Sequence, residues 1–563
     1  MLDPSAYADT FARDNLPPRE LWPAMDYRAL PEIAAYPKRL NAAVELLDRM
    51  VEKGHGDRPC LRAPGGLVWT YRDVLEKANR VANVLTRDFG LVPGNRVLLR
   101  AANNPMMAVC WLGVVKAGGI AVATMPLLRA RELTYVIAKA KVRFALCDAT
   151  LAGELETARE KAPLERVLYW GSATGGGGDG LDAAMARQPA DFANVETSHD
   201  DVILIAFTSG TTGQPKGTMH FHRDALAICD TFVSHVLKAE PSDIFCGSPP
   251  LAFTFGLGGM LLFPMRAGAS TLLIEKPSAE GLLRAIQEHR CTVTFTAPTL
   301  YRAMAEMAPR YDLSSLRKSV SAGETLPLPV FEAWRKATGI RIIDGLGSTE
   351  MLHIFVAAAG DDIRPGATGK AIPGFEAKVV DEDGNEVPRN TVGRLAVRGP
   401  TGCRYLDDPR QTNYVQHGWN LTGDAYRMDE DGYLWYQART DDMIISAGYN
   451  ISGPEVEAVL LDHPMVAECA VIGAPDAERG EIVKAFVVLR DGAAGDEATA
   501  TELQEFVKAQ IAPYKYPRAV EFISALPRTE TGKMQRFRLR EMERKRAVSE
   551  TVATSVQPAA ASA

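Results

Sequence analysis

The sequence lacks paired cysteines, a long apolar run and a basic N-terminal segment. Its eight cysteines are scattered and none forms a C-x-x-C pair, so reduced thiols in a cytoplasmic protein are expected, not a disulfide or zinc framework. No basic region followed by an apolar one opens the chain, and no signal peptide is predicted. The most apolar segment, residues 106–128, carries Lys116, the pair Gly118-Gly119 and Pro126. It favours a buried helix followed by a buried strand over a membrane span.

The chain also lacks an excess of basic residues. Lysine and arginine total 63 against 70 acidic residues, which gives a net charge of −7 and argues against nonspecific binding to nucleic acid or an anionic membrane. We therefore expect small-molecule partners, no nucleic acid, no membrane, and a monomer or homodimer. A length of 563 residues exceeds one compact core, so two or more domains are predicted.

Helical and strand patterns alternate along most of the chain. Apolar residues recur at helical spacing in 39–53 and 73–88, and short β-rich runs stand at 96–99, 120–123, 270–274 and 292–295. This alternation predicts an α/β fold (α+β overall), with helices flanking mixed, mostly parallel sheets. A β-rich subdomain is expected from residue 379 and a compact α+β unit after 439, while 171–180 reads as a flexible loop and the end of the chain as a disordered tail.

One segment is rich in glycine and hydroxyl residues. Residues 207–217 read F-T-S-G-T-T-G-Q-P-K-G after an apolar run at 202–206. The spacing is not that of the Walker P-loop, because Lys216 precedes a glycine in place of a serine or threonine. The composition nevertheless predicts a cradle for phosphate oxygens.

Three further loops each present one charged residue. Glu350 ends G-L-G-S-T-E; a carboxylate beside phosphates needs a cation between them, so it is a candidate Mg²⁺ ligand. Asp424 ends a predicted tight turn, where an aspartate can bind a ribose diol. Lys533 lies on a predicted loop and would stabilise charge at phosphorus if that loop closed over a nucleotide. Each residue alone is more often a solvated charge. His220 and His222 share a strand face, but without a third ligand ordinary packing is favoured over a metal site.

The order of these motifs resembles the adenylate-forming superfamily of acyl-CoA synthetases, luciferases and adenylation domains. The resemblance extends from about residue 38 to 541. It implies an N-terminal ATP- and acid-binding domain at 1–440, a small mobile C-terminal domain at 441–541 and a tail at 542–563. It also implies ATP and Mg²⁺, with coenzyme A as cosubstrate.

The resemblance assigns roles residue by residue. Catalysis falls to Lys533, Glu350 and Thr349, with Glu350 on Mg²⁺. The implied ATP and AMP contacts are Thr208, Ser209, Gly210, Thr211, Thr212, Lys216, Gly323, Glu324, Asp344, Gly345, Leu346, Asp424 and Arg439. Leu346 departs from the family, where many relatives stack an aromatic residue on adenine. Asp441 matches the hinge about which the C-terminal domain rotates between two half-reactions, and Gly448 and Tyr449 match the CoA tunnel.

The implied acid pocket combines Phe253, Thr254 and Phe255 with Gly347 and His353. Two aromatic residues and a small threonine suit a flat, compact acid better than a long acyl chain. The string G-S-T-E-M-L-H-I-F resembles the benzoate-CoA ligase branch, and the N-terminal segment looks most like 2-aminobenzoate-CoA ligases. The expected activity is AMP-forming ligation of an aromatic acid to CoA. The alternatives are an adenylation enzyme that loads a carrier protein, a short- or medium-chain acyl-CoA synthetase, a non-catalytic nucleotide-binding protein and a luciferase-like oxidase.

Overall fold

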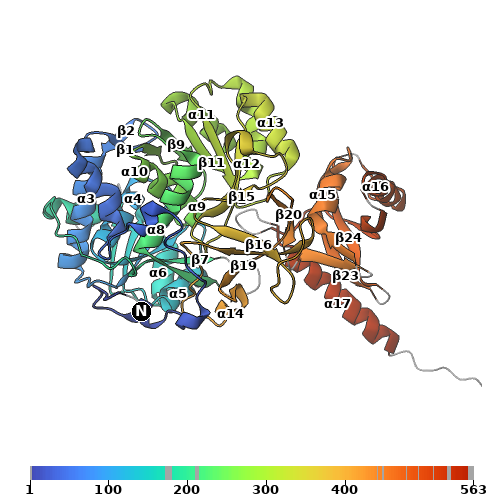
Figure 1. Ribbon diagram of the computed structural model, residues 1–563, viewed down its shortest axis with the longest axis horizontal. Coiled ribbons are helices and arrows are strands. Elements are labelled where there is room, and N and C mark those ends of the chain that lie inside the picture. Colours follow the sequence, from blue (N-terminus) through green and yellow to red (C-terminus); the bar gives the residue numbers. More distant parts are fainter. Residues whose placement is uncertain are drawn as a thin grey trace, which may run out of the picture.

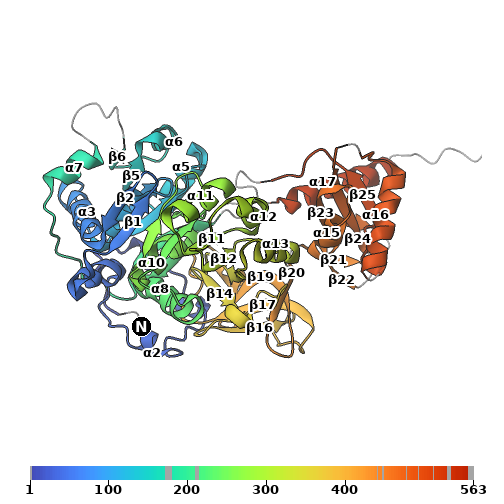
Figure 2. The same cartoon turned by 90° about the horizontal axis from the view of Figure 1, so that it is seen from above.

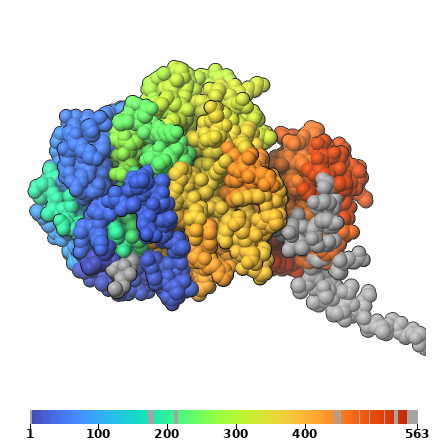
Figure 3. Space-filling view, viewed as in Figure 1, coloured from blue at the N-terminus to red at the C-terminus, as the bar shows by residue number. Residues whose placement is uncertain are grey.

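The protein folds into a large N-terminal domain and a small C-terminal domain. The computed structural model describes residues 3–171, 180–208, 215–439, 442–446, 449–476, 479–491, 493–511, 513–528 and 534–555. In Figures 1 and 2 the small domain, orange to red, stands beside the large one. Figure 3 shows its atoms as a separate lobe. The predicted α/β fold with a large mixed-sheet domain and a small α+β domain is confirmed.

The first sheet of the large domain has six strands, which are parallel except for the final pair. Their order is β6 (Arg166–Trp170), β5 (Phe144–Asp148), β3 (Arg96–Arg100), β4 (Ile120–Thr124), β7 (Val202–Thr208) and β8 (Lys216–Phe221). The helices along this part of the chain are α3 (Tyr71–Asn83), α4 (Pro105–Lys116), α5 (Ala130–Lys139), α6 (Ala152–Arg159) and α7 (Leu181–Arg187). The antiparallel β7–β8 hairpin places the predicted phosphate segment at one edge of this sheet.

The second sheet has nine strands and a parallel centre. Its order is β15 (Lys370–Ala371), β14 (Ile354–Ala357), β13 (Ile342–Gly347), β12 (Lys318–Ala322), β11 (Val293–Thr296), β9 (Ile244–Gly247), β10 (Ser270–Leu272), β1 (Pro59–Ala63) and β2 (Leu67–Thr70). Its helical segments are α8 (His222–Ile228), η6 (Cys229–Leu237), α9 (Thr254–Leu257), η7 (Gly258–Leu262), α10 (Phe263–Ala267), α11 (Ala279–His289), α12 (Pro298–Met307) and α13 (Leu328–Thr338).

Helix α4 lies in the core of the large domain. Pro105 occupies its first turn, where no N–H is needed, and the Asn104 side chain caps it by accepting from the Met107 N–H. Lys116 ends the helix fully buried and pairs with Asp48 at 2.5 Å, so its charge is compensated. The buried helix followed by a buried strand, predicted for 106–128, is confirmed by α4 and β4. Among the described residues no helix is long and apolar enough to span a bilayer.

A third sheet forms the β-rich subdomain, and a fourth forms the small domain. The third contains β16 (Glu376–Val380), β17 (Val392–Arg398), β18 (Val415–Gln416), β19 (Trp419–Met428) and β20 (Leu434–Arg439), with α14 (Gln411–Tyr414) beside it. The fourth contains β21 (Met443–Ser446), β22 (Tyr449–Ser452), β23 (Val466–Asp476), β24 (Gly480–Leu489) and β25 (Ala519–Phe522), with α15 (Gly453–Leu461), α16 (Glu497–Gln510) and α17 (Arg536–Ser555). The two sheets adjoin where the Ser452 hydroxyl donates to the Gln437 carbonyl.

Both predicted helices are present in the structure. The pattern at 73–88 corresponds to α3 followed by η4 (Val84–Asp88), and the pattern at 39–53 corresponds to a helical stretch that includes η2 (Val44–Asp48) and η3 (Val51–His55). Short α1 (Phe11–Asp14) and α2 (Pro31–Ala34) precede them. Helix α17 continues past residue 541, where the tail was expected to begin. Residues 556–563 and most of the 171–180 loop lie outside the described residues.

Candidate functional site

The phosphate segment connects the two strands of the β7–β8 hairpin. Thr208 and Lys216 face each other as the last register pair of that hairpin. The Thr208 hydroxyl oxygen is shielded from solvent and has no hydrogen-bond partner among the described residues. An unpaired buried hydroxyl is costly, and a phosphate oxygen would satisfy it. Ser209, Gly210, Thr211 and Thr212 fall outside the described residues.

The predicted G-x-G-S-T-E loop is shorter than expected. Gly345, Leu346 and Gly347 belong to β13, paired with β14, so these three residues form a strand and not a loop. At Gly345 an added Cβ would lie 2.5 Å from Ile354, so only glycine fits this pairing. The turn begins at Ser348, whose hydroxyl lies 3.2 Å from that of Tyr414. Leu346, which the resemblance places against adenine, is half-buried.

The turn at 348–350 is held from β8. His220 Nε2 donates to the Thr349 carbonyl oxygen at 2.7 Å, and the buried His220 Nδ1 lies 3.7 Å from Asp224. His222 makes different contacts, because its Nδ1 accepts the Ala42 N–H at 3.1 Å. The two histidines therefore serve separate packing roles, as the packing interpretation predicted.

Glu350 is buried beside the end of the phosphate segment. Its Oε1 accepts a hydrogen bond from the Tyr405 hydroxyl at 2.5 Å and lies 3.4 Å from Lys216 Nζ. Mg²⁺ takes one or two carboxylates plus phosphate oxygens as ligands. The Glu350 carboxylate and the phosphates of a bound nucleotide would together supply ligands of this kind. The structure thus brings Thr208, Lys216 and Glu350 together, although they are far apart in sequence.

The predicted ribose residues lie side by side on two strands. Asp424 of β19 is the register partner of Arg439 of β20, and Arg439 Nη1 lies 3.1 Å from Asp424 Oδ1. The predicted tight turn at 418–424 is wrong, because residues 419–424 are part of β19. Gly423 adopts a φ of +76°, which favours glycine. The buried Asp424 is held there as a hydrogen-bond acceptor.

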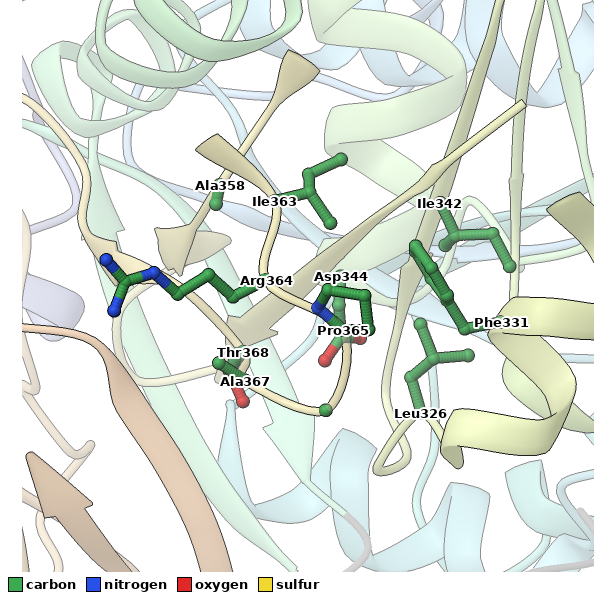
Figure 4. A pocket seen from close by; sticks show the side chains of 11 residues that line it. Leu326, Phe331, Ile342, Asp344, Ala358, Ile363, Arg364, Pro365, Ala367 and Thr368 are labelled. Carbon is green, nitrogen blue, oxygen red and sulfur yellow. The ribbon is translucent and has the colours of Figure 1, made fainter. Parts of the chain in front are cut away.

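Asp344, one of the implied nucleotide residues, lines a small cavity shown in Figure 4. In this view it lies behind Pro365, with Phe331 and Leu326 to the right. The cavity has room for about one water molecule. Asp344 Oδ1 is shielded without a partner among the described residues, and burial raises the pKa of this carboxyl to about 8. A partly protonated carboxyl suits an uncharged partner such as a nucleobase.

Two further implied nucleotide residues, Gly323 and Glu324, lie at the surface. Gly323 has a φ of +87° with open space around it, and the exposed Glu324 accepts the Thr299 hydroxyl at 2.7 Å. The structure therefore leaves residues 323–324 accessible to a planar ligand.

Aromatic rings from distant segments pack against one another at the residues of the predicted acid pocket. His353 stacks edge-on against Phe263 at 4.4 Å between centroids and lies 5.6 Å from Phe255. Phe255 in turn lies 5.8 Å from Phe295. Phe253 is half-buried and precedes α9, whose first residue is the buried Thr254. The wall is completed by backbone, because a Cβ at Gly347 would lie 2.8 Å from the His353 carbonyl oxygen.

His353 is an uncharged polar group within this cluster of aromatic rings. Burial lowers its pKa to about 3, so the imidazole is neutral at physiological pH. Its Nε2 lies 3.3 Å from the Phe255 carbonyl oxygen and donates to it. That tautomer makes Nδ1 an acceptor, and Nδ1 is buried without a partner among the described residues.

Several predicted residues of the small domain lie outside the described residues. These are Lys533, Asp441 and Gly448. The Tyr449 backbone is in β22, opposite Ser446 of β21. Asp442, next to the predicted hinge, pairs with Arg540 of α17.

Sequence reasoning missed residues that contact the predicted site residues and fix their positions. Tyr405 contacts both Lys216 and Glu350, while Phe263 and Phe295 shape the acid pocket. No short motif contains these residues. Only the β-rich run at 292–295 pointed to burial, that of Phe295, and it did not indicate what this ring would pack against.

The large domain brings together a hairpin-borne segment ending at Lys216, the buried carboxylate of Glu350 and a cluster of aromatic rings around His353, and a small domain follows it. The chain belongs to the AMP-binding enzyme family of the adenylate-forming superfamily: the family's sequence model matches residues 47–404, and that of the AMP-binding enzyme C-terminal domain matches 455–533.

Similar proteins cover nearly the whole chain. A benzoate–CoA ligase from Thauera aromatica is 35% identical over 92% of this chain and 98% of its own length. A 3-hydroxybenzoate–CoA ligase from an Aromatoleum strain is 32% identical over 89% and 97%. The crystal structure of the anthranilate CoA ligase AuaEII with anthranoyl-AMP superposes with a TM-score of 0.84, at 35% identity over 92% of this chain and 99% of that one.

Proposed function

We propose that this protein activates an aromatic carboxylic acid of the benzoate or 2-aminobenzoate type with ATP and transfers it to CoA. The products are the aryl-CoA, AMP and pyrophosphate. The observation that carries the aromatic assignment is the cluster formed by the rings of Phe255, Phe263 and His353. A wall of such rings suits a flat aromatic acid better than a long acyl chain. The aryl-CoA ligases among the relatives support the same choice.

The first half-reaction joins two anions. The acid carboxylate attacks the α-phosphorus of ATP and displaces pyrophosphate, forming an acyl adenylate. Mg²⁺, bound by Glu350 and phosphate oxygens, would neutralise phosphate charge. Lys216 and the hydroxyls of the phosphate segment bind the β- and γ-phosphates, Thr349 contacts the α-phosphate, and Asp424 with Arg439 binds the ribose. Lys533 donates to the developing charge at phosphorus, the kind of stabilisation worth roughly 10²–10³ in rate.

The second half-reaction needs a different arrangement, because Lys533 occupies space that the thiol requires. We assign residues 441–541 to a C-terminal domain that rotates about Asp441 between the two steps. Gly448 and Tyr449 then line the path of the CoA thiol. The break between β20, which ends at Arg439, and β21, which begins at Met443, supports a boundary at this point.

The unpaired nitrogen of His353 favours 2-aminobenzoate within this class. An ortho amino group can donate to the neutral Nδ1, and benzoate cannot. The anthranilate ligase relative supports the same assignment. One such hydrogen bond contributes about 0.5–1.5 kcal/mol, a preference of about 3- to 10-fold.

A panel of acids tests the proposal. AMP and CoA-thioester formation should be measured with benzoate, 2-aminobenzoate, 3-hydroxybenzoate and short and medium aliphatic acids. In His353→Phe, which keeps a ring in the cluster, the preference for 2-aminobenzoate over benzoate should fall about 3- to 10-fold while the KM for ATP is unchanged. ADP and phosphate as products would contradict the mechanism.

The same assay separates the alternatives. Higher kcat/KM on aliphatic acids would favour a short- or medium-chain acyl-CoA synthetase. Transfer to a carrier-protein thiol and not to CoA would favour a stand-alone adenylation enzyme.

A further inference from the structure

Tyr405 lies between the two charged residues at the end of the phosphate segment. Its hydroxyl is 2.6 Å from Lys216 Nζ and 2.5 Å from Glu350 Oε1. We propose that Tyr405 is a positioning residue that orients the Glu350 carboxylate for the divalent cation of the nucleotide. This inference rests on the proposed function, in which Glu350 binds that cation.

The direction of each hydrogen bond follows from the chemistry of the groups. An ammonium can only donate and a carboxylate can only accept, so the hydroxyl accepts from Lys216 and donates to Glu350. The single hydrogen of the hydroxyl is therefore committed to the carboxylate.

The tyrosine is fixed by its backbone. Leu406 N–H donates to the Gly217 carbonyl and Met219 N–H to the Arg404 carbonyl, so residues 404–406 lie along β8. The Tyr405 N–H donates to the Gln411 side chain at 2.9 Å. These backbone hydrogen bonds fix the position of the tyrosine, so that its hydroxyl can orient the Glu350 side chain on the neighbouring turn.

The arrangement leaves one carboxylate oxygen for the cation. Oε1 is held by Tyr405, so Oε2 is the oxygen available for coordination. When nucleotide binds, Lys216 is needed at a phosphate, and Tyr405 remains as the group that keeps Glu350 in place. Without the hydroxyl, Lys216 is the nearest partner of Glu350 among the described residues, and their ion pair competes with the cation. Hydrogen-bonded partners of metal ligands are typically worth about 10- to 100-fold in metal affinity.

The test measures cation affinity without turnover. The full-length protein is titrated with Mn²⁺ in the presence of α,β-methylene-ATP, and bound Mn²⁺ is followed by electron paramagnetic resonance. Tyr405→Phe should weaken Mn²⁺ binding about 10-fold or more while binding of the metal-free analogue changes less than about twofold. The matched control is Tyr71→Phe. Tyr71 is equally buried, and its hydroxyl donates to the Ala269 carbonyl at 2.8 Å, away from the site. This control should lower thermal stability without changing Mn²⁺ affinity.

A double-mutant cycle separates this inference from the proposed function. Glu350→Gln should weaken Mn²⁺ binding, and adding Tyr405→Phe to it should have no further effect, because the tyrosine acts through the carboxylate. If Glu350→Gln leaves Mn²⁺ affinity unchanged, the metal role of Glu350 is wrong. If Glu350→Gln weakens binding but Tyr405→Phe does not, or if the two effects are independent, only the positioning role is overturned.

Discussion

The nucleotide side and the acid side of the site are built in opposite ways. The nucleotide side consists of charged and hydroxyl groups held by hydrogen bonds, such as Lys216, Tyr405 and Glu350. The acid side consists of rings and glycines in van der Waals contact, and His353 and Thr254 are buried polar side chains within it. Hydrogen bonds fix the orientation of the charged side chains, whereas ring packing fixes the space left for the acid. Substitutions on the first side should therefore change rates and ATP binding, and those on the second should change which acid is accepted.

The largest effect tests the charged side. Replacing Lys533 with alanine should lower adenylate formation by at least roughly 10²–10³, because it removes a cation aimed at the transition state. Pyrophosphate exchange with ATP measures this step. Transfer of a preformed acyl adenylate to CoA should continue at the wild-type rate. Equal damage to both steps would contradict the proposed rotation of the C-terminal domain.

A smaller effect tests the packed side. In Gly258→Ala the new methyl would lie 2.3 Å from the His353 ring, so the ring must move. Such overpacking should cost about 1–3 kcal/mol of stability and alter the ranking of ring-substituted acids. Gly153→Ala is a control with open space around the added Cβ. Thermal melting and acid-competition assays measure the two effects, and a changed KM for ATP with an unchanged acid ranking would mean that the pocket is elsewhere.

A third prediction concerns Asp344, the nucleotide-side carboxyl that lines the cavity in Figure 4. Its pKa is raised to about 8 by burial, against about 3.9 when unfolded. The folded state therefore holds a proton that the unfolded state has lost, and this group's contribution to stability falls as pH rises from about 4 to 8. Asp344→Asn keeps an uncharged side chain, so its melting temperature relative to wild type should rise across this window and level off above it. A difference independent of pH would show that Asp344 is ionised when folded.

The same difference between the two sides explains which site residues could be predicted from the sequence. The nucleotide residues were predictable because charge and hydroxyl groups in a fixed order indicate their chemistry. Tyr405 was not, because its two partners lie 189 and 55 residues away. The glycine-containing motifs at 345–350 and 418–424 were predicted as a loop and a tight turn. In the structure, residues 345–347 and 419–424 belong to strands that pair with their neighbours. Tertiary pairing overrode the local preference of glycine for turns.

The main-chain wall of the acid pocket has a consequence for laboratory evolution. Gly256 has no room for a methyl group, since a Cβ would lie 2.0 Å from the Pro250 carbonyl oxygen, and Gly347 is similarly confined. A library meant to admit bulkier acids gains nothing from varying these positions. New space has to come from trimming Phe255, which leaves the backbone scaffold intact.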